Sequence, residues 1–101
     1  MEIKNSVIGK YCIVRGNEFG VFAGTVAVVE GSTVLLKDAR RIWYWDGAAS
    51  LSQLAAEGVK APKNCRFTVA VESIVLIGAI EIIPTTILAE MNIKEVTEWK
   101  R

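Results

Sequence analysis

Residues 38–47 read Asp-Ala-Arg-Arg-Ile-Trp-Tyr-Trp-Asp-Gly, and they lead into residues 50–54, Ser-Leu-Ser-Gln-Leu. The first segment has the composition of a β-strand and the second has the composition of a helix start. Side chains of a strand alternate between its two faces. One face then carries Arg41, Trp43 and Trp45, and the other carries Arg40, Ile42, Tyr44 and Asp46. A shift of the register by one residue would exchange Arg40 and Arg41.

This segment supports two interpretations. A planar cation beside two indoles is the surface chemistry that stacks on a nucleobase and holds a phosphate. Arg41, Trp43 and Trp45 are therefore candidate ligand-binding residues, with Arg40 and Tyr44 beside them. In the other interpretation the tryptophans belong to the hydrophobic core and the arginines cover its rim.

The rest of the chain predicts a β-rich α+β fold with an antiparallel sheet of about five to six strands. One helix follows the Trp-Tyr-Trp strand, because Ser50 and Gln53 match a capping box and Gly58 suits the residue after a helix. A short C-terminal helix is expected over 87–91. We expect the whole chain, 1–101, to form one domain, with residues 96–101 as an edge strand or an arm. The expected strands are 11–15, 20–29, 33–37, the arginine–tryptophan segment within 38–47, 65–69 and 73–77. Residues 79–83 are expected to continue the last of these strands.

The composition of the chain argues against several classes of function. The 101 residues carry a formal charge of +1 and no histidine. Binding of long nucleic acid normally needs a basic excess, so we expect none. Without histidine and without a cluster of metal ligands we expect no metal, no cofactor and no enzymatic activity. Because 51% of the residues are apolar, in a domain with a high ratio of surface to volume, we expect a homo-oligomer.

The cysteines and the hydropathy of the chain indicate where in the cell the protein is located. Cys12 and Cys65 are far apart in the sequence, and we expect two buried, reduced thiols; a disulfide or a nucleophile is the alternative. The start of the chain lacks the apolar region of a signal peptide, and the apolar run at 74–80 is too short to cross a bilayer. We therefore expect a cytoplasmic protein that does not enter a membrane.

Three further groups of residues are candidates for the binding site. Ala48, Ala49, Ser50 and Ser52 surround a predicted helix start, where backbone N–H groups can bind an anion; capping alone is the alternative role for Ser50. Arg15 and Phe19 lie in a loop that either lines a pocket or is a simple hairpin turn with an exposed ion pair. Asn64 and Arg66 could contact a base edge and a phosphate, although polar residues at a strand start are usually solvated.

The segments Val-Phe-Ala-Gly at 21–24, residues 39–55 and Glu-Ile-Ile-Pro at 81–84 resemble a family of small phage and prophage proteins of unknown function. The motif Ala-Arg-Arg-Ile-Trp-Tyr-Trp-x-Gly-Ala at 39–48 is the specific part of the resemblance. The chain departs from the family at Asn17-Glu18-Phe19, where the family has smaller residues. The resemblance implies a phage origin and a place in the host cytoplasm, without an established activity.

A looser analogy suggests a function. Phages encode small, oligomeric, non-catalytic proteins that act as sponges for the nucleotide signals of bacterial immunity. We therefore expect an anti-defence protein that sequesters a nucleotide-derived signal, such as a cyclic ADP-ribose isomer or a cyclic oligonucleotide. Two alternatives remain: an interaction module that inhibits a host protein, and a small β-barrel that binds single-stranded nucleic acid.

Overall fold

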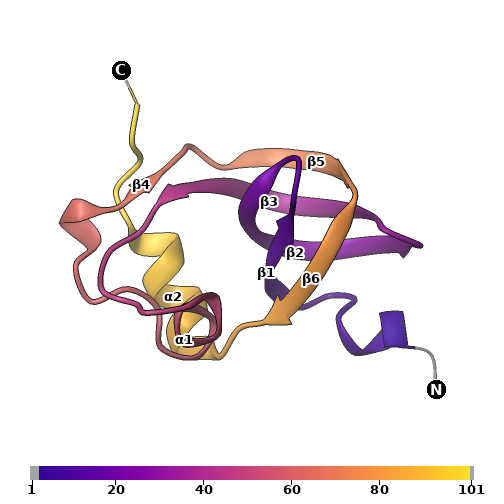
Figure 1. Cartoon of the computed structure of the whole chain (residues 1–101), viewed down its shortest axis with the longest axis horizontal. Helices are drawn as coiled ribbons and strands as arrows, with labels where there is room; N and C mark the ends of the chain where they lie inside the picture. The colour runs from indigo at the N-terminus through magenta and orange to yellow at the C-terminus, as the bar shows by residue number, and fades with distance from the viewer. Residues whose placement is uncertain (1–2, 101) are drawn as a thin grey trace.

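Antiparallel strands and two helices account for most of the chain in the computed structural model, which describes residues 3–100 (Figure 1). The fold class expected from the sequence, a β-rich α+β fold with a helix in mid-chain and another near the C-terminus, is confirmed. The elements in chain order are η1 (Ile3–Ser6), β1 (Tyr11–Gly16), β2 (Gly20–Glu30), β3 (Thr33–Tyr44), α1 (Leu51–Glu57), η2 (Pro62–Asn64), β4 (Arg66–Phe67), β5 (Val71–Ile77), β6 (Ala79–Pro84) and α2 (Ile87–Glu95).

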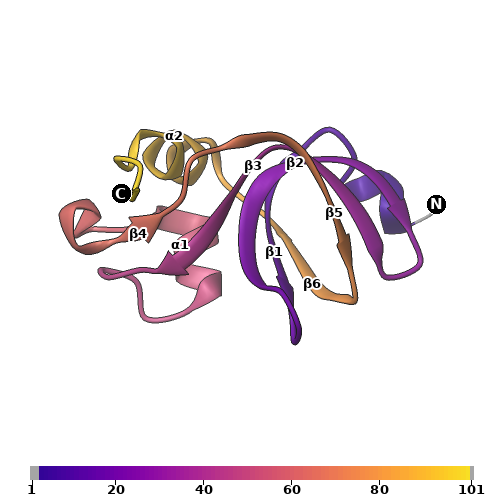
Figure 2. The ribbon, with the colours of Figure 1, turned by 90° about the horizontal axis from the view of Figure 1, so that it is seen from above.

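The sheet rolls up on itself. Its strand order is β4-β3-β2-β1-β6, with β5 paired to β3 on the same side as β4. Only Gly78 separates β5 from β6, so one bent segment pairs with β3 at its start and with β1 at its end. Gly78 has a φ of 91°, a left-handed conformation that glycine adopts without steric cost. The result is a small, partly open barrel, with both helices beside it (Figure 2).

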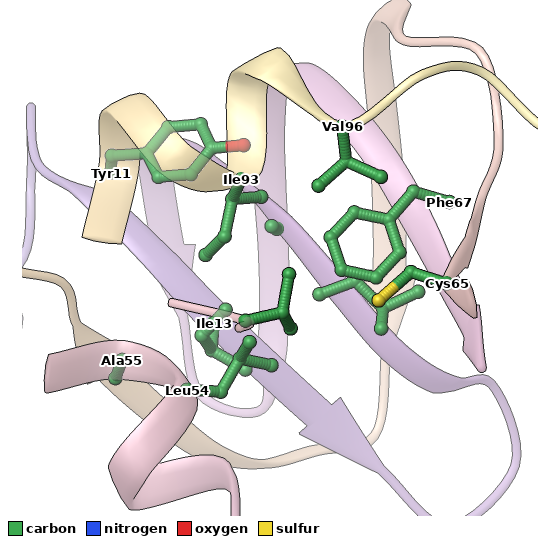
Figure 3. Packing of buried hydrophobic residues seen from close by; sticks show 11 residues of the cluster. Tyr11, Ile13, Leu54, Ala55, Cys65, Phe67, Ile93 and Val96 are labelled. Carbon is green, nitrogen blue, oxygen red and sulfur yellow. The ribbon is translucent and has the colours of Figure 1, made fainter. Parts of the chain in front are cut away.

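Both faces of β1 are buried. Cys12 and Val14 of β1 point into the barrel, where they join Phe22, Leu36 and other apolar side chains. The alternate residues of β1, Tyr11 and Ile13, point outward to a second apolar cluster under α1 and α2 (Figure 3). This pattern follows from the period of two along a strand. It explains why β1 reads as a continuous apolar run.

A bulge at Asp38 decides how β3 is oriented. Thr25 pairs with Lys37 and Ala23 with Arg40, so β3 has one residue more than β2 across this interval. Asp38 has a φ of 50°, a conformation that Asp tolerates better than most residues. Even-numbered residues of β3 point into the barrel before the bulge, and Ala39 does so after it. The two strands expected at 33–37 and in the arginine–tryptophan segment are therefore one continuous strand with a bulge at Asp38.

The helices begin and end largely where the sequence predicts. The Ser50 hydroxyl accepts a hydrogen bond from the Gln53 N–H, and the Gly58 N–H donates to the Leu54 carbonyl at the end of α1. The second helix, α2, runs four residues further than the expected 87–91. Among the helices that the structure describes, none has the length and apolar character needed to span a membrane.

Two expected elements differ. The strand expected at 65–69 contains only two residues, because β4 pairs with β3 only at the C-terminal end of β3. The expected C-terminal strand or arm lies against its own domain, where Glu98 forms a single parallel bridge to Phe67. Residue 101, the end of that predicted segment, and residues 1–2 of the predicted domain lie outside the described residues.

Candidate functional site

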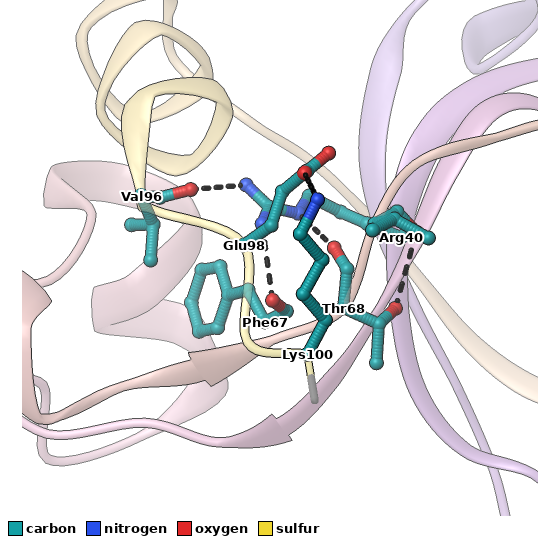
Figure 4. A network of polar contacts seen from close by, with 7 residues as sticks. Arg40, Phe67, Thr68, Val96, Glu98 and Lys100 are labelled. Carbon is teal, nitrogen blue, oxygen red and sulfur yellow. Dashed lines mark hydrogen bonds and ion pairs between the residues drawn. The ribbon is translucent and has the colours of Figure 1, made fainter.

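Arg40 lies inside the protein, with only 5% of its surface exposed. Its guanidinium donates four hydrogen bonds to backbone carbonyls and, among residues 3–100, none to a carboxylate (Figure 4). Two acceptors, the Ile93 and Val96 carbonyls, are at 2.9 Å at the end of α2. The other two are the Thr68 carbonyl at 2.9 Å and the Phe67 carbonyl at 3.1 Å, which continue from β4.

This environment makes Arg40 a structural residue. Four of the five N–H groups of its guanidinium are used within the protein. The unpaired carbonyls at the C-terminal end of a helix carry partial negative charge, which favours a cation there. Burial nevertheless lowers the pKa of Arg40 from its usual value. The expectation that Arg40 contributes to a ligand site is therefore corrected.

Arg41 is half-buried and bound to the loop between β1 and β2. Its Nη1 donates to the Phe19 carbonyl at 2.6 Å, and its guanidinium carbon lies 4.3 Å from the centre of the Phe22 ring. These contacts hold Phe19 over the end of the barrel, where it also packs edge-to-face on Phe22. Arg41 thus fixes the wall of the site, and its guanidinium is only partly available to a ligand.

Trp43 is the most exposed aromatic residue of the arginine–tryptophan segment, with 60% of its surface accessible. Its ring is parallel to that of Trp99, with 6.5 Å between the ring centres and 4° between the planes. The Arg66 guanidinium carbon lies 5.5 Å from the centre of the Trp99 ring. Trp99 is held in place because its backbone N–H donates to the Phe67 carbonyl at 2.8 Å. Two indoles and a guanidinium from β3, β4 and the tail therefore share one surface.

Two hollows lie on either side of Trp43. One, of about 500 Å³, is lined by Trp43, Tyr44, Asn64 and Arg66. The other, of about 400 Å³, includes Phe19, Arg41, Trp43 and Trp45 in its lining. Seven of the candidate residues therefore border two adjacent hollows that share Trp43. We refer to the two hollows together as the Trp43 site.

The start of α1 does not contribute to the Trp43 site. The Gln53 side chain accepts from the Ala49 N–H at 2.7 Å, and Ser50 caps the helix. Ala48 packs against the outer apolar cluster, and Ser52 is exposed on the helix. Of the residues expected to form an anion site, Ala49 and Ser50 therefore have partners within the helix start. None of Ala48, Ala49, Ser50 and Ser52 lines the Trp43 site.

Arg15 is also separate from the Trp43 site. Its Nε donates to Glu81 at 2.7 Å, and both side chains are largely exposed. The expected ligand-binding role of Arg15 is therefore replaced by a surface ion pair between β1 and β6. Arg15 is therefore the ion-pair partner of Glu81.

Asn64 and the cysteine next to it hold the loop after Trp45. The Asn64 amide donates to Asp46 at 3.0 Å, and the Asp46 N–H donates to the Cys65 sulfur at 3.4 Å. Cys12 and Cys65 are both buried free thiols. Burial raises the pKa of Cys65 and raises that of Cys12 to about 11, so neither thiol is an activated nucleophile.

Sequence reasoning missed Trp99. The tail at 96–101 was expected to be a strand or an arm, and nothing nearby in the sequence ties it to the arginine–tryptophan segment. The available signal was compositional: Trp99 is the third tryptophan of a chain that has three, and it lies next to charged residues.

Residues 9–93 match the family described as Domain of unknown function (DUF6948). The match agrees with the expected resemblance to an uncharacterised family. No curated protein matches the chain.

Proposed function

We propose that this chain, which belongs to the DUF6948 family, binds a nucleotide-type ligand at the Trp43 site and holds it without chemical turnover. The observation that carries the proposal is the exposed Trp43 indole, which forms a wall of both hollows. Arg66 is on the same surface, at the rim of the larger hollow. A stacking plane beside a guanidinium matches the two parts of a nucleotide, the base and the phosphate.

The division of roles follows from the contacts. Trp43 would stack on the base, which contributes about 1–3 kcal/mol per base. Arg66 would bind the phosphate through charge-assisted hydrogen bonds, since among the described residues no carboxylate forms an ion pair with it. Tyr44, 52% exposed in the same hollow, would add a hydroxyl donor. The sequence favoured Arg41 for the phosphate; its bond to Phe19 makes Arg66 the better candidate.

Retention without turnover is supported by the chemistry of the chain. It contains no histidine, and its two thiols are buried with raised pKa values. The described residues include no group of three or more carboxylates and cysteines that could share a metal ion. The biological use we propose is that of a phage anti-defence sponge in the host cytoplasm. It would sequester a cyclic ADP-ribose isomer or a cyclic oligonucleotide.

The experiment is a thermal-shift screen with cyclic ADP-ribose isomers, cyclic di- and trinucleotides and mononucleotides. A ligand at 100 times its Kd stabilises the fold by about 2.7 kcal/mol, which is about 10 °C or more in a domain of this size. Mass spectrometry of the ligand released by heating should return it unaltered. A ligand returned in altered form would show an enzyme and contradict the proposal.

Two variants locate the site. Trp43→Ala and Arg66→Ala should each weaken binding tenfold or more, at about 1.4 kcal/mol per factor of ten, while the circular dichroism spectrum is unchanged. Arg15→Ala is the matched control, because it removes an exposed arginine outside the hollows. Unchanged affinity in both site variants would refute the assignment.

A second candidate is a protein-interaction module. Trp43, Tyr44 and Trp99 are each more than 40% exposed, and Trp, Tyr and Arg are the residues enriched at interaction hot spots. In that case the panel gives no shift, and one stoichiometric host partner is retained by the wild type and lost with Trp43→Ala. Binding to single-stranded nucleic acid, the remaining alternative, would instead show a steep dependence on salt.

A further inference from the structure

We propose that two copies of this chain pair through the free edge of β5, which forms an antiparallel ladder with β5 of the other copy. Among the described residues, β5 pairs with β3 alone, and its other edge has no neighbouring strand. β5 lies along the upper rim of the sheet in Figure 1 and nearest the viewer in Figure 2.

The backbone of β5 presents hydrogen-bonding groups at this edge. The Gly78 N–H donates to the Ser32 carbonyl at 3.0 Å, one step beyond the pair of Ile77 with Thr33. Because backbone groups of an antiparallel strand alternate in direction, those of Ile74 and Leu76 point to β3. Those of Val71, Ser73, Val75 and Ile77 then point to the free edge. They can bind another strand without disturbing the existing ladder.

The side chains of Ser73, Val75 and Ile77 lie on the outer face of the sheet, because their β3 partners alternate with the inward-facing Val34 and Leu36. Two of these three side chains are apolar. Val75 is 57% exposed and Ile77 is 71% exposed, although neither is near the Trp43 site. The apolar surface continues across the sheet, because Val75 pairs with Leu35 and Leu35 pairs with Val28. An apolar face that reaches an open edge is a surface on which burial favours pairing.

The strand is complementary to itself. If the twofold axis passes through Ile74, Val71 lies opposite the partner's Ile77, and Ser73 lies opposite the partner's Val75. All four are residues with edge-directed backbone groups, so each pair can exchange two hydrogen bonds. Glu72, the only charged residue of β5, then lies opposite the partner's Leu76 and four residues along from the partner's Glu72. A second copy therefore meets no repulsion between like charges.

The opposite edge of the sheet is less suitable. Among the described strands, β6 also has a neighbour on one side only, but residues of η1 line a hollow together with it. Ile3, Ser6 and Val7 line a hollow of about 760 Å³ together with residues of β6. By contrast, β5 contains no lysine, no proline and no bulge against β3, and Glu72 is its only charged residue.

The first test is the mass of the full chain in solution by size-exclusion chromatography with light scattering. We expect twice the 11.1 kDa of one chain for the wild type and 11.1 kDa for Val75→Lys, with an unchanged circular dichroism spectrum. Leu88→Lys is the matched control, because Leu88 is 66% exposed on α2, and this variant should remain a dimer. A monomeric wild type at high concentration, or a dimeric Val75→Lys, would overturn the proposal.

A second test reports the register and does not depend on how Val75→Lys folds. The double variant Ser73→Cys with Val75→Cys should form a covalent dimer on mild oxidation, because hydrogen-bonded partners lie about 5.5 Å apart, within disulfide reach. Val71→Cys with Val75→Cys is the control, since the proposed register places neither residue opposite the other. The native thiols are buried and do not compete. Equal cross-linking of both variants, or of neither, would contradict the register.

Discussion

Replacement of Arg40 by methionine tests how much its buried guanidinium stabilises the packing of β4 and the end of α2 against β3. Arg40 connects β3 to β4 and to the end of α2 through four backbone carbonyls. Methionine keeps much of the apolar stem but removes every donor. The Phe67 and Ile93 carbonyls keep the backbone N–H groups of Trp99 and Val96 as donors, so the Thr68 and Val96 carbonyls are the two left unpaired. At about 2 kcal/mol for each buried unpaired carbonyl, the loss is about 4 kcal/mol. The desolvation of a charge is avoided in the variant, which returns part of this amount.

We therefore expect Arg40→Met to lose about 3 kcal/mol, a large part of the about 5–15 kcal/mol of a typical domain. The assay is urea unfolding followed by tryptophan fluorescence and circular dichroism. The midpoint should fall by about 1 M or more, since the slope is about 1–3 kcal/mol/M. Arg15→Met is the control, because an exposed ion pair contributes about 0–1 kcal/mol. If Arg40→Met shifts the midpoint no more than Arg15→Met does, the network is not stabilising.

Two further changes test the packing and the thiol chemistry. Gly47 has a φ of 93°, and an added Cβ would lie 2.6 Å from the Ala61 backbone nitrogen. Gly47→Ala should therefore lower the free energy of unfolding by about 2 kcal/mol or more, and calorimetry should show a Tm lower by several degrees. Unchanged Tm would show that this loop moves freely. Burial raises the pKa of Cys12 from its ordinary value of 9.0 to about 11, so the unfolded chain loses this proton first. Stability should therefore decline as pH rises from about 9 to about 11, and less so in Cys12→Ala, as urea midpoints at each pH would report. Equal declines in the two proteins would contradict the assignment to Cys12.

Much of the fold follows from local patterns. The start and end of α1 are predicted by Ser50, Gln53 and Gly58, because capping depends on groups a few residues apart. The alternation in residues 40–43 is also predicted, with Ile42 buried and Trp43 exposed. The length of a helix is harder to predict from local patterns. The extension of α2 beyond residue 91 depends on Ile93, which is buried only because the outer face of the sheet lies under it.

The site was predicted only in part. The expected residues around Trp43 do line two hollows, but the start of α1 and Arg15 have other partners. Trp99 was not expected there, because a contact between residue 43 and residue 99 leaves no local pattern in the sequence. Long-range contacts of this kind depend on the rolled sheet, which brings β4 and the tail next to β3.

The sequence by itself determined that this is a β-rich α+β fold with a capped helix after an arginine–tryptophan strand, since such patterns repeat over a few residues. Only the tertiary structure decided which arginine is structural. The bulge at Asp38 shifts the alternation of β3 by one residue, and a shift of one residue moves every following side chain to the other face. Arg40 therefore lies under α2, where backbone carbonyls from distant segments accept the hydrogen bonds of its guanidinium. Trp43 is left on the surface, on the face away from the buried Ile42.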